Sequence, residues 1–337
     1  MDNLTHSLVG ALLGQMGLKR KTGLAMPTLI IAANIPDIDA VAVLLGGQQH
    51  LAIRRGITHG PIAMVLLPLL LWAAMLWFDA WQTKRGKRPE KRLPVHKGWL
   101  LALAIIGCLS HPLFDWFNSY GIRLLEPFSS QWFYGDTLFI IDVWIWAALI
   151  VGLWLSVHRE RKEHRDWHRP ARISFLLVCS YILFNGFITT TAETVAKSSH
   201  YKWGIEKVTK VVANPVPIQF WKRDMVIQID GFSYYLVPFA LFSGLGDRPT
   251  KTMEMIITDK VVHELDFGNP QLNDFLFWSR LPYLDFESEE CLLPCPPDFS
   301  KPTVARVRDA RFSDLLVTDR FSVSVVIPPL EDDLTVE

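Results

Sequence analysis

The chain has 337 residues, half of them hydrophobic, and its 34 lysines and arginines balance its 34 aspartates and glutamates. A formal net charge of zero gives no electrostatic reason for nucleic-acid binding, so no nucleic-acid partner is expected. The apolar residues are concentrated before about Thr191, in runs near the roughly 20 residues that cross a bilayer. We therefore expect a mainly α fold: a polytopic transmembrane helical bundle at residues 1–192, followed by a small α+β soluble domain at residues 193–337.

About six membrane segments are expected. The first, from Leu4 to Leu18, is marginal for a full span and could be re-entrant or tilted; no basic region precedes it, so it is not a signal peptide. The other five are residues 24–45, 62–81, 99–115, 138–157 and 173–191. Pro36 interrupts the second segment and predicts a break in its helix. Broken backbone in a membrane is tolerated where it lines a cavity or is buried in protein.

The distribution of lysine and arginine predicts the orientation. Residues 82–97 and 158–172 are rich in both, whereas residues 116–137 contain only Arg123. Basic loops remain in the cytoplasm, so the first two loops should be cytoplasmic and the third external. We expect a multi-pass protein of the bacterial inner membrane with its C-terminal domain in the periplasm.

Ionisable residues gather at the external ends of the apolar segments, where burying them costs several kcal/mol and marks them as functional candidates. His111 and Asp115, four residues apart, share one face of a helix and are close enough to bind one ion. The predicted metal ligands are His6, Asp37, Asp39, His59, His111, Asp115, Asp136 and Asp142.

Imidazole and carboxylate ligands suit Zn²⁺ first and then Mn²⁺ or Fe²⁺, with one to three ions expected. Neighbouring metal ions can generate hydroxide near neutral pH and clamp the oxygens of a displaced phosphoryl group. The sequence contains neither GxxxxGK[ST] nor GxGxxG, so hydrolysis is the expected reaction. A lipid or another phosphoester is the expected substrate. Asp39 and Arg55 are the candidate catalytic residues. Arg54 and Arg55 could be ordinary headgroup contacts or, as part of the site, bind a substrate phosphate.

Structural alternatives remain open for these residues. Asp37 and Asp39 would diverge by about 200° on an intact α-helix. Both can reach one site only if the helix breaks at Pro36; otherwise one binds metal and the other caps a helix or holds a histidine. For Asp136 and Asp142, the alternative is that Gly135-Asp136-Thr137 forms a turn and a helix N-cap.

Five motifs, taken as an ordered set, resemble the bacterial family of predicted inner-membrane metal-dependent hydrolases. They are Thr5-His6-Ser7, Pro36-Asp37-Ile38-Asp39, residues 55–60 (RGITHG), residues 110–115 (SHPLFD) and residues 134–142 (YGDTLFIID). That family is distantly similar to zinc-dependent phospholipase C and P1 nuclease, in which a His-x-x-x-Asp motif, matched by His111 and Asp115, supplies metal ligands. The resemblance implies phosphoester hydrolysis. The sequence has no His-x-x-x-Glu partner motif like that of the phospholipases.

The leading hypothesis is thus a membrane-bound metal-dependent hydrolase at the periplasmic face, with metal-bound hydroxide as its nucleophile. A metal or solute transporter and a non-catalytic scaffold are the alternatives.

In the C-terminal domain, residues 225–229, Asp230-Gly231 and residues 232–235 indicate a β-hairpin, and residues 320–326 alternate as a strand. Residues 272–278 could form a short helix. Cys291 and Cys295 could form a disulfide outside the cytoplasm or remain free thiols.

Overall fold

The computed structural model describes residues 1–46, 48–199, 208–229, 233–254, 269–286, 303–313 and 321–327. The chain divides into two compact units. The first comprises Met1–Val41, Arg54–Thr189 and Pro215–Phe220, and the second comprises Ala42–Ile53, Thr190–Asn214 and Trp221–Glu337. The first unit is helical and contains every residue predicted to bind metal.

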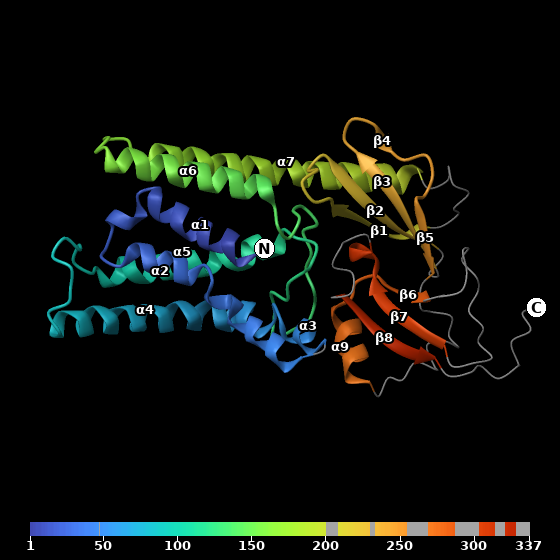
Figure 1. Ribbon diagram of the computed structural model, residues 1–337, viewed down its shortest axis with the longest axis horizontal. Helices are drawn as coiled ribbons and strands as arrows, with labels where there is room; N and C mark the ends of the chain where they lie inside the picture. The colour runs from blue at the N-terminus through green and yellow to red at the C-terminus, as the bar shows by residue number, and fades with distance from the viewer. Residues whose placement is uncertain are drawn as a thin grey trace, which may run out of the picture. The chain divides into compact units, whose positions relative to one another are not determined.

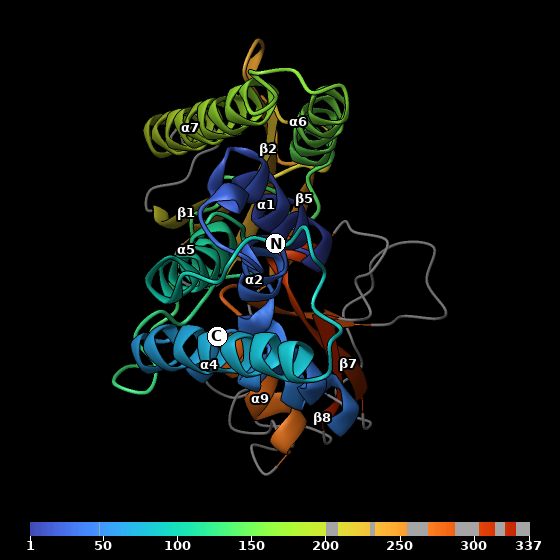
Figure 2. The ribbon, with the colours of Figure 1, turned by 90° about the vertical axis from the view of Figure 1, so that its left-hand side faces the viewer.

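The first unit is built from α-helices and short 3₁₀ segments (Figure 1). The helices are α1 (Asn3–Gln15), α2 (Ala25–Ala32), α4 (Pro61–Lys84), α5 (Lys97–Trp116), α6 (Val143–Arg161) and α7 (Arg169–Ser199), with 3₁₀ segments η1 (Leu18–Arg20), η2 (Ile35–Leu45) and η3 (Ile57–His59). The C-terminal part of α7 continues into the second unit. Helix α1 packs against α2 and α6, and α5 packs against α2 and α4. In the view along the helices, α1 and α2 lie between α4 on one side and α6 with α7 on the other (Figure 2).

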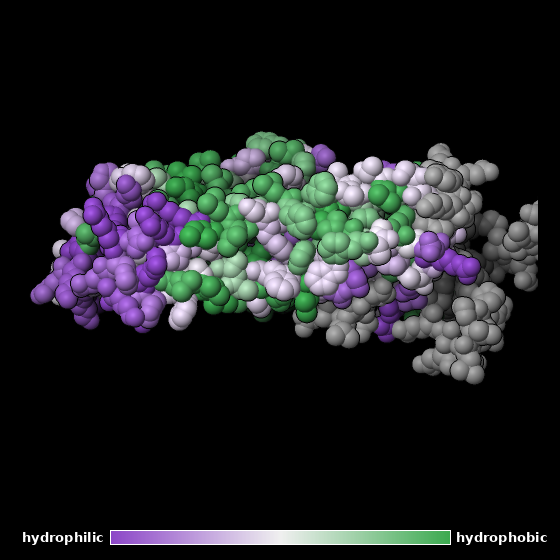
Figure 3. All heavy atoms as spheres, turned by 90° about the horizontal axis from the view of Figure 1, so that it is seen from above, coloured by the Kyte–Doolittle hydropathy of each residue, from purple (hydrophilic) through white to green (hydrophobic). Residues whose placement is uncertain are grey.

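Among the described residues, three helices, α4, α5 and α7, are long and apolar enough to cross a membrane, and α2 with η2 makes a fourth if that bent pair is one span. The expectation of six spans is therefore not supported. Helix α1 has only 13 residues, and α6 carries His158, Arg159 and Arg161 in its last turn, which shortens its apolar part. Apolar side chains nevertheless cover much of the face seen in Figure 3, and hydrophilic residues gather at one end. Trp154 of α6 and Leu183 of α7 are among the exposed large hydrophobic residues.

The expected break at Pro36 is confirmed. Helix α2 ends at Ala32, and η2 continues at an angle of 44°. Asn34 stabilises the junction through two hydrogen bonds. Its side-chain amide donates to the backbone carbonyl of Ile30 at 2.8 Å, and its backbone carbonyl accepts from the N–H of Asp37 at 3.0 Å. The change to 3₁₀ geometry redirects the residues after Pro36, so the two aspartates need not follow α-helical spacing.

A glycine brings α5 against the end of α2. A Cβ atom on Gly107 would lie 2.6 Å from the Cβ of Ala32 and 3.0 Å from the carbonyl oxygen of Leu29. Small residues allow two membrane helices to approach this closely. His111 is four residues after Gly107 and therefore lies beside the C-terminal end of α2.

In its described residues, the second unit contains two sheets (Figure 1). The first has the strand order β1 (Val208–Pro215), β2 (Lys222–Ile229), β3 (Ser233–Ala240) and β4 (Gly244–Leu245), with β5 (Lys251–Glu254) paired to β3; the second has the order β6 (Pro282–Phe286), β7 (Thr303–Asp309) and β8 (Ser322–Ile327). Buried side chains from both sheets, among them Val226, Tyr234 and Tyr283, form one core. Helix α9 (Pro270–Trp278) packs against α3 (Gln49–Ile53).

The strands of the expected hairpin are β2 and β3, which pair from Ile229 opposite Ser233 to Lys222 opposite Ala240. The expected strand at residues 320–326 is β8, and the expected short helix is α9. The hairpin turn at residues 230–232 and the pair Cys291 and Cys295 lie outside the described residues.

Candidate metal centre

Four buried side chains of the first unit bring one donor atom each into a single group. They are Asp37, His59, His111 and Asp115, and their donor atoms all lie within 4.8 Å of one another. The Nε2 atoms of His59 and His111 are 3.1 Å apart. Asp115 Oδ2 lies 3.6 Å from His59 Nε2 and 3.5 Å from His111 Nε2. Asp37 Oδ1 lies 4.0 and 3.7 Å from the same two nitrogens.

These separations fit one small divalent cation. Zinc binds nitrogen and oxygen ligands at about 2.0–2.2 Å, so two ligands of a tetrahedral ion are about 3.3–3.6 Å apart. The distances that involve the two histidines, from 3.1 to 4.0 Å, lie around that value. Two imidazoles and two carboxylates are a suitable ligand set for Zn²⁺, Mn²⁺ or Fe²⁺. The four residues therefore pass a test of both spacing and chemistry.

The hydrogen bond of His111 determines which ring nitrogen faces the group. Its Nδ1 lies 2.7 Å from the carbonyl oxygen of Ala33. A carbonyl can only accept, so Nδ1 carries the hydrogen and the Nε2 of a neutral ring presents its lone pair to the other donors. A backbone carbonyl on the far nitrogen is the arrangement that orients metal-binding histidines.

His59 is oriented by a short relay. Its Nδ1 lies 2.9 Å from Thr58 Oγ1, and this hydroxyl donates to Asp39 Oδ2 at 2.9 Å. Since the hydroxyl hydrogen is committed to Asp39, the hydroxyl oxygen accepts from His59 Nδ1, and His59 Nε2 is left with a lone pair. Burial, and then the neighbouring His111, hold the pKa of His59 well below its usual value, so the ring is neutral at pH 7. A neutral imidazole is the form that binds metal.

Two nitrogen lone pairs that face each other at 3.1 Å repel unless a proton or a cation lies between them. The buried carboxylates add negative charge at the same point. Among the described residues, Asp115 Oδ2 and Asp37 Oδ2 accept no hydrogen bond of good geometry. Buried polar atoms of this kind are rare in folded proteins and usually indicate an ion or another functional partner.

Arg55 supports Asp115 from outside the group. Its Nε lies 3.0 Å from Asp115 Oδ2, and its terminal nitrogen donates to Asn118 Oδ1 at 3.0 Å and to the carbonyl of Gly121 at 3.2 Å. Burial lowers the pKa of Arg55 to about 10, which leaves it charged at neutral pH. Its φ of 55° is unusual for a residue with a side chain. This conformation is held by its N–H, which donates to Asp39 Oδ2 at 2.7 Å.

Arg54 differs from its neighbour because its side chain is 25% exposed. Its terminal nitrogen lies 3.3 Å from Asp37 Oδ1, and its Nε lies 4.0 Å from Asp39 Oδ1. Arg54 thus connects a candidate metal ligand with the outside of the unit.

His6 lies beside the group without belonging to it. Its ring stacks on that of His111 with the centroids 3.8 Å apart, and its Nε2 lies 3.3 Å from Asp115 Oδ1. The amino group of Met1 contacts the same carboxylate oxygen. Asp39, as described above, contacts Thr58 and Arg55 and likewise lies outside the four-atom group.

Asp136 and Asp142 are also outside this group. Asp142 is the N-cap of α6: its Oδ1 accepts from the N–H groups of Trp144 and Ile145 at 3.0 and 3.1 Å, and its Oδ2 accepts from the hydroxyl of Tyr181 at 3.0 Å. The sequence offered an N-cap at Gly135-Asp136-Thr137, whereas the N-cap of α6 is Asp142. Asp136 is buried in a left-handed conformation, and its carbonyl accepts from Thr189 Oγ1 at 2.7 Å.

Two residues that position the candidate ligands, Asn118 and Thr58, were not predicted from the sequence. Asn118 follows the end of α5 and receives the Arg55 guanidinium, and Thr58 joins Asp39 to His59. Asn118 is three residues after Asp115, so its proximity to the motif was the available signal. Thr58 precedes His59 directly and could be taken for a simple helix cap.

Apolar helices long enough to cross a bilayer, together with a buried carboxylate–imidazole cluster, define a membrane-embedded helical protein with a candidate divalent-metal centre. Residues 1–192 match the YdjM inner membrane protein family, and because this match covers more than half of the chain, the protein belongs to that family. The expected inner-membrane family is thereby confirmed. Its expected relationship to phospholipase C and P1 nuclease stays a prediction.

Among curated proteins, the chain is similar to "Uncharacterized protein YfhP" of Bacillus subtilis (strain 168), with 25% identity over 166 residues. The aligned region covers 46% of this chain and 47% of that protein, so the chain spans about half the length of the relative it matches. No solved structure matches the chain.

Proposed function

We propose that this protein is a membrane-bound metal-dependent hydrolase that cleaves a phosphoester of a lipid or lipid-linked substrate at the periplasmic face of the inner membrane. Asp37, His59, His111 and Asp115 would hold the ion, with zinc as the first choice. The observation that carries the proposal is the 3.1 Å approach of the His59 and His111 Nε2 atoms, flanked by two buried carboxylates. When bound, the ion supplies a Lewis acid and makes water a better nucleophile at neutral pH.

The residues around the ligands have separable roles. Thr58 and Asp39 orient His59, whereas Arg55 and Asn118 position Asp115. These contacts favour positioning roles for Asp39 and Arg55. Arg54 is the partly exposed cation beside Asp37 and is therefore our candidate for the residue that binds the substrate phosphate.

A groove beside Asp37 supports a substrate with an apolar part. It has a volume of about 430 Å³, and its walls include Asp37 together with Ile30, Ile31, Ile35 and Ile38. Ile31 and Ile38 are 41% and 61% exposed, as expected of side chains that face lipid. One wall residue of the groove is thus also a candidate metal ligand, so an acyl chain in the groove would bring its headgroup to the ion.

The periplasmic side is proposed from the charge distribution. Helix α5 begins at Lys97, next to the basic loop, and His111 follows 14 residues later, about 21 Å along the helix. The candidate centre therefore lies toward the end of α5 opposite that basic loop. The C-terminal unit follows α7 and would be periplasmic under the same rule.

One experiment tests the proposal. The full chain, purified in detergent, is assayed for bound metal by elemental analysis and for hydrolysis of a chromogenic phosphodiester and of phospholipid, as wild type, His111→Ala and His164→Ala. His164 lies in an exposed loop and is the matched control. We expect stoichiometric metal and hydrolysis in the wild type and control, and loss of both in His111→Ala.

The other outcomes overturn the proposal in distinguishable ways. Metal retained by His111→Ala would exclude the site. Bound metal without hydrolysis, moved across vesicle membranes, would support a transporter, and absence of metal from every preparation would support a scaffold.

A further inference from the structure

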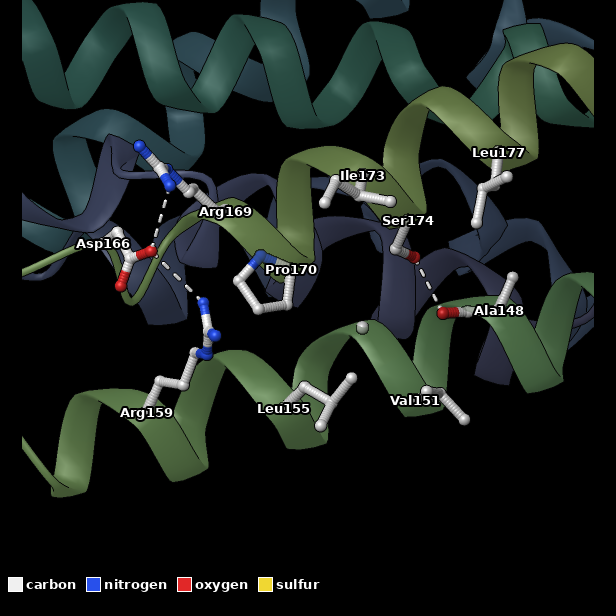
Figure 4. Close-up of a pocket in the computed structure, with 11 residues that line it drawn as sticks. Ala148, Val151, Leu155, Arg159, Asp166, Arg169, Pro170, Ile173, Ser174 and Leu177 are labelled. Carbon is white, nitrogen blue, oxygen red and sulfur yellow. Dashed lines mark hydrogen bonds and ion pairs between the residues drawn. The ribbon is translucent and has the colours of Figure 1, made fainter. Parts of the chain in front are cut away.

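A second hollow lies between α6 and α7, away from the candidate metal centre (Figure 4). Its volume is about 490 Å³, within the range of small-molecule sites. The two helices meet closely at Gly152, where a Cβ atom would lie 2.3 Å from the Cβ of Ser174, and Ser174 Oγ donates to the carbonyl of Ala148 at 2.7 Å. This close contact between α6 and α7 forms the bottom of the hollow.

Two stripes of side chains form the walls of the groove. Val151, Leu155 and Arg159 follow one another at intervals of four residues on α6, and Arg169, Ile173 and Leu177 do so on α7. Residues at this spacing lie on one face of a helix. The helices run in opposite directions, so each wall is apolar along its length and both end in an arginine at the same end.

Asp166 holds the two arginines together at that end. Its Oδ2 lies 3.3 Å from an Nη1 atom of Arg159 and 3.3 Å from an Nη1 atom of Arg169. The three residues carry a net charge of +1. Each guanidinium has five N–H donors, and this carboxylate oxygen engages one terminal nitrogen of each. The side chains of Arg159 and Arg169 are 42% and 69% exposed, which leaves room for an anion with several oxygens.

Tryptophans place this end at the level of lipid headgroups. The ammonium of Lys19 lies 4.6 Å from the ring centre of Trp167, and that of Lys21 lies 4.9 Å from Trp99. The guanidinium of Arg85 lies 4.6 Å from Trp81. Tryptophan paired with basic residues is typical of the membrane interface.

We propose that this groove, which we call the α6–α7 groove, binds one anionic phospholipid of the surrounding leaflet. One acyl chain lies against Val151, Leu155, Ile173 and Leu177, and the phosphate bridges Arg159 and Arg169. The two arginines and Asp166 leave a net positive charge at this end of the groove, and a lipid of net negative charge complements it. Phosphatidylcholine also offers a phosphate that matches the fork geometry of arginine, but its own ammonium group cancels that charge. Basic pockets between membrane helices at this level are suited to anionic headgroups.

Native mass spectrometry of the full chain in detergent tests this assignment, with phosphatidylglycerol and phosphatidylcholine of the same acyl chains as probes. We expect the wild type to retain one phosphatidylglycerol in preference to phosphatidylcholine. R159Q/R169Q should lose about tenfold in that preference, because two charge-assisted contacts are removed. R161Q/R165Q, the matched control, removes the same charge from exposed residues of the same segment and should retain the preference.

V151W provides a second, independent test, because Val151 is 52% exposed and a larger side chain there fills the groove without altering its charge. This variant should lose the bound lipid although both arginines remain. Equal retention of the two lipids by the wild type would overturn the proposal. So would equal losses in R159Q/R169Q and R161Q/R165Q, or unchanged retention in V151W. If R159Q/R169Q does not fold, V151W decides the question.

Discussion

Asp115 in the helical unit and Asp309 in the β unit are both fully buried carboxylates, and their surroundings differ. Both oxygens of Asp309 are bonded: Oδ1 accepts from the N–H and Nε of Arg311 at 2.9 and 2.8 Å, and Oδ2 accepts from Ser279 Oγ at 2.6 Å and from the N–H of Arg280 at 2.8 Å. Asp115 Oδ2 instead has one guanidinium and two imidazoles within 3.0–3.6 Å, and among the described residues none of them donates to it with good geometry.

The difference separates a structural site from the proposed metal site. Complete hydrogen bonding compensates the desolvation of Asp309 and joins β7 to the segment before β6. The charge of Asp115 is only partly compensated: Arg55 and the amino group of Met1 contact its two oxygens, but Asp115 Oδ2 accepts no hydrogen bond of good geometry among the described residues. Proteins tolerate such uncompensated groups at functional sites, where the stability lost is regained when the ligand binds.

The largest effect is expected at Asp309. Asp309→Ala leaves Arg311 buried without its carboxylate, and breaking a buried pair in this way costs about 3–5 kcal/mol. We expect hydrogen exchange in β6, β7 and β8 to lose protection by that amount, or the β unit to unfold. Asp285→Ala is the control, because Asp285 pairs with Arg308 at 3.0 Å while 40% exposed, and it should cost less than about 1 kcal/mol. Equal effects of the two variants would contradict the distinction.

Removal of the metal should destabilise the helical unit around Asp115 and leave the β unit unchanged. An ion present at about 1,000 times its dissociation constant stabilises the folded state by about 4 kcal/mol, and a chelator abolishes this contribution. We expect chelation to reduce protection from hydrogen exchange around His59 and the end of α5 and to leave β6–β8 unchanged. His111→Ala protein should not respond. A response confined to β6–β8 would contradict our assignment of the two clusters.

The stability of the β unit should depend on pH through Asp309 and its partners Arg311 and Ser279. Burial alone would raise the pKa of Asp309, but the charge and hydrogen bonds of Arg311, with that of Ser279, lower it to about 2 from an unfolded value near 3.8. The folded pKa is depressed, so this stabilisation is complete above about pH 4 and is lost as the pH falls toward 2. It amounts to roughly 2 kcal/mol.

Hydrogen exchange in β6–β8, normalised to intrinsic rates, measures this dependence in wild type and Asp309→Asn. The stability difference between the two proteins should shrink as the pH falls through this range. A difference independent of pH would show that the charge of Asp309 does not contribute.

Local chemistry predicted several features of the helical unit from sequence. Pro36 breaks its span because its effect on the backbone is local, and His111 and Asp115 approach each other because four residues complete one helical turn. The expectation of six spans is not supported at two of its segments, because α1 is short and the last turn of α6 is basic.

The features of the candidate site that were not predicted depend on contacts between segments far apart in the sequence. The distinction between Arg54 and Arg55 follows from the left-handed backbone of Arg55, which turns one guanidinium inward to Asp115 and Asn118. No pattern of neighbouring residues specifies that turn. The sequence predicted Asp142 as a metal ligand, and only the fold shows that this aspartate is the N-cap of α6.

The smallest predicted effect tests the relay that joins Asp39 to His59. Thr58→Val keeps the shape of the side chain but removes the hydroxyl that accepts from His59 Nδ1 and donates to Asp39 Oδ2. Partners that orient a metal-binding histidine are worth 10- to 100-fold in affinity, and a partly exposed threonine should lie near the lower limit, about tenfold. Metal affinity measured by competition with a chromophoric chelator should therefore fall by about tenfold in Thr58→Val and recover in Thr58→Ser, which restores the hydroxyl. If Thr58→Ser were as weak as Thr58→Val, packing of the threonine methyl group would be responsible, and Asp39 would have no part in holding His59.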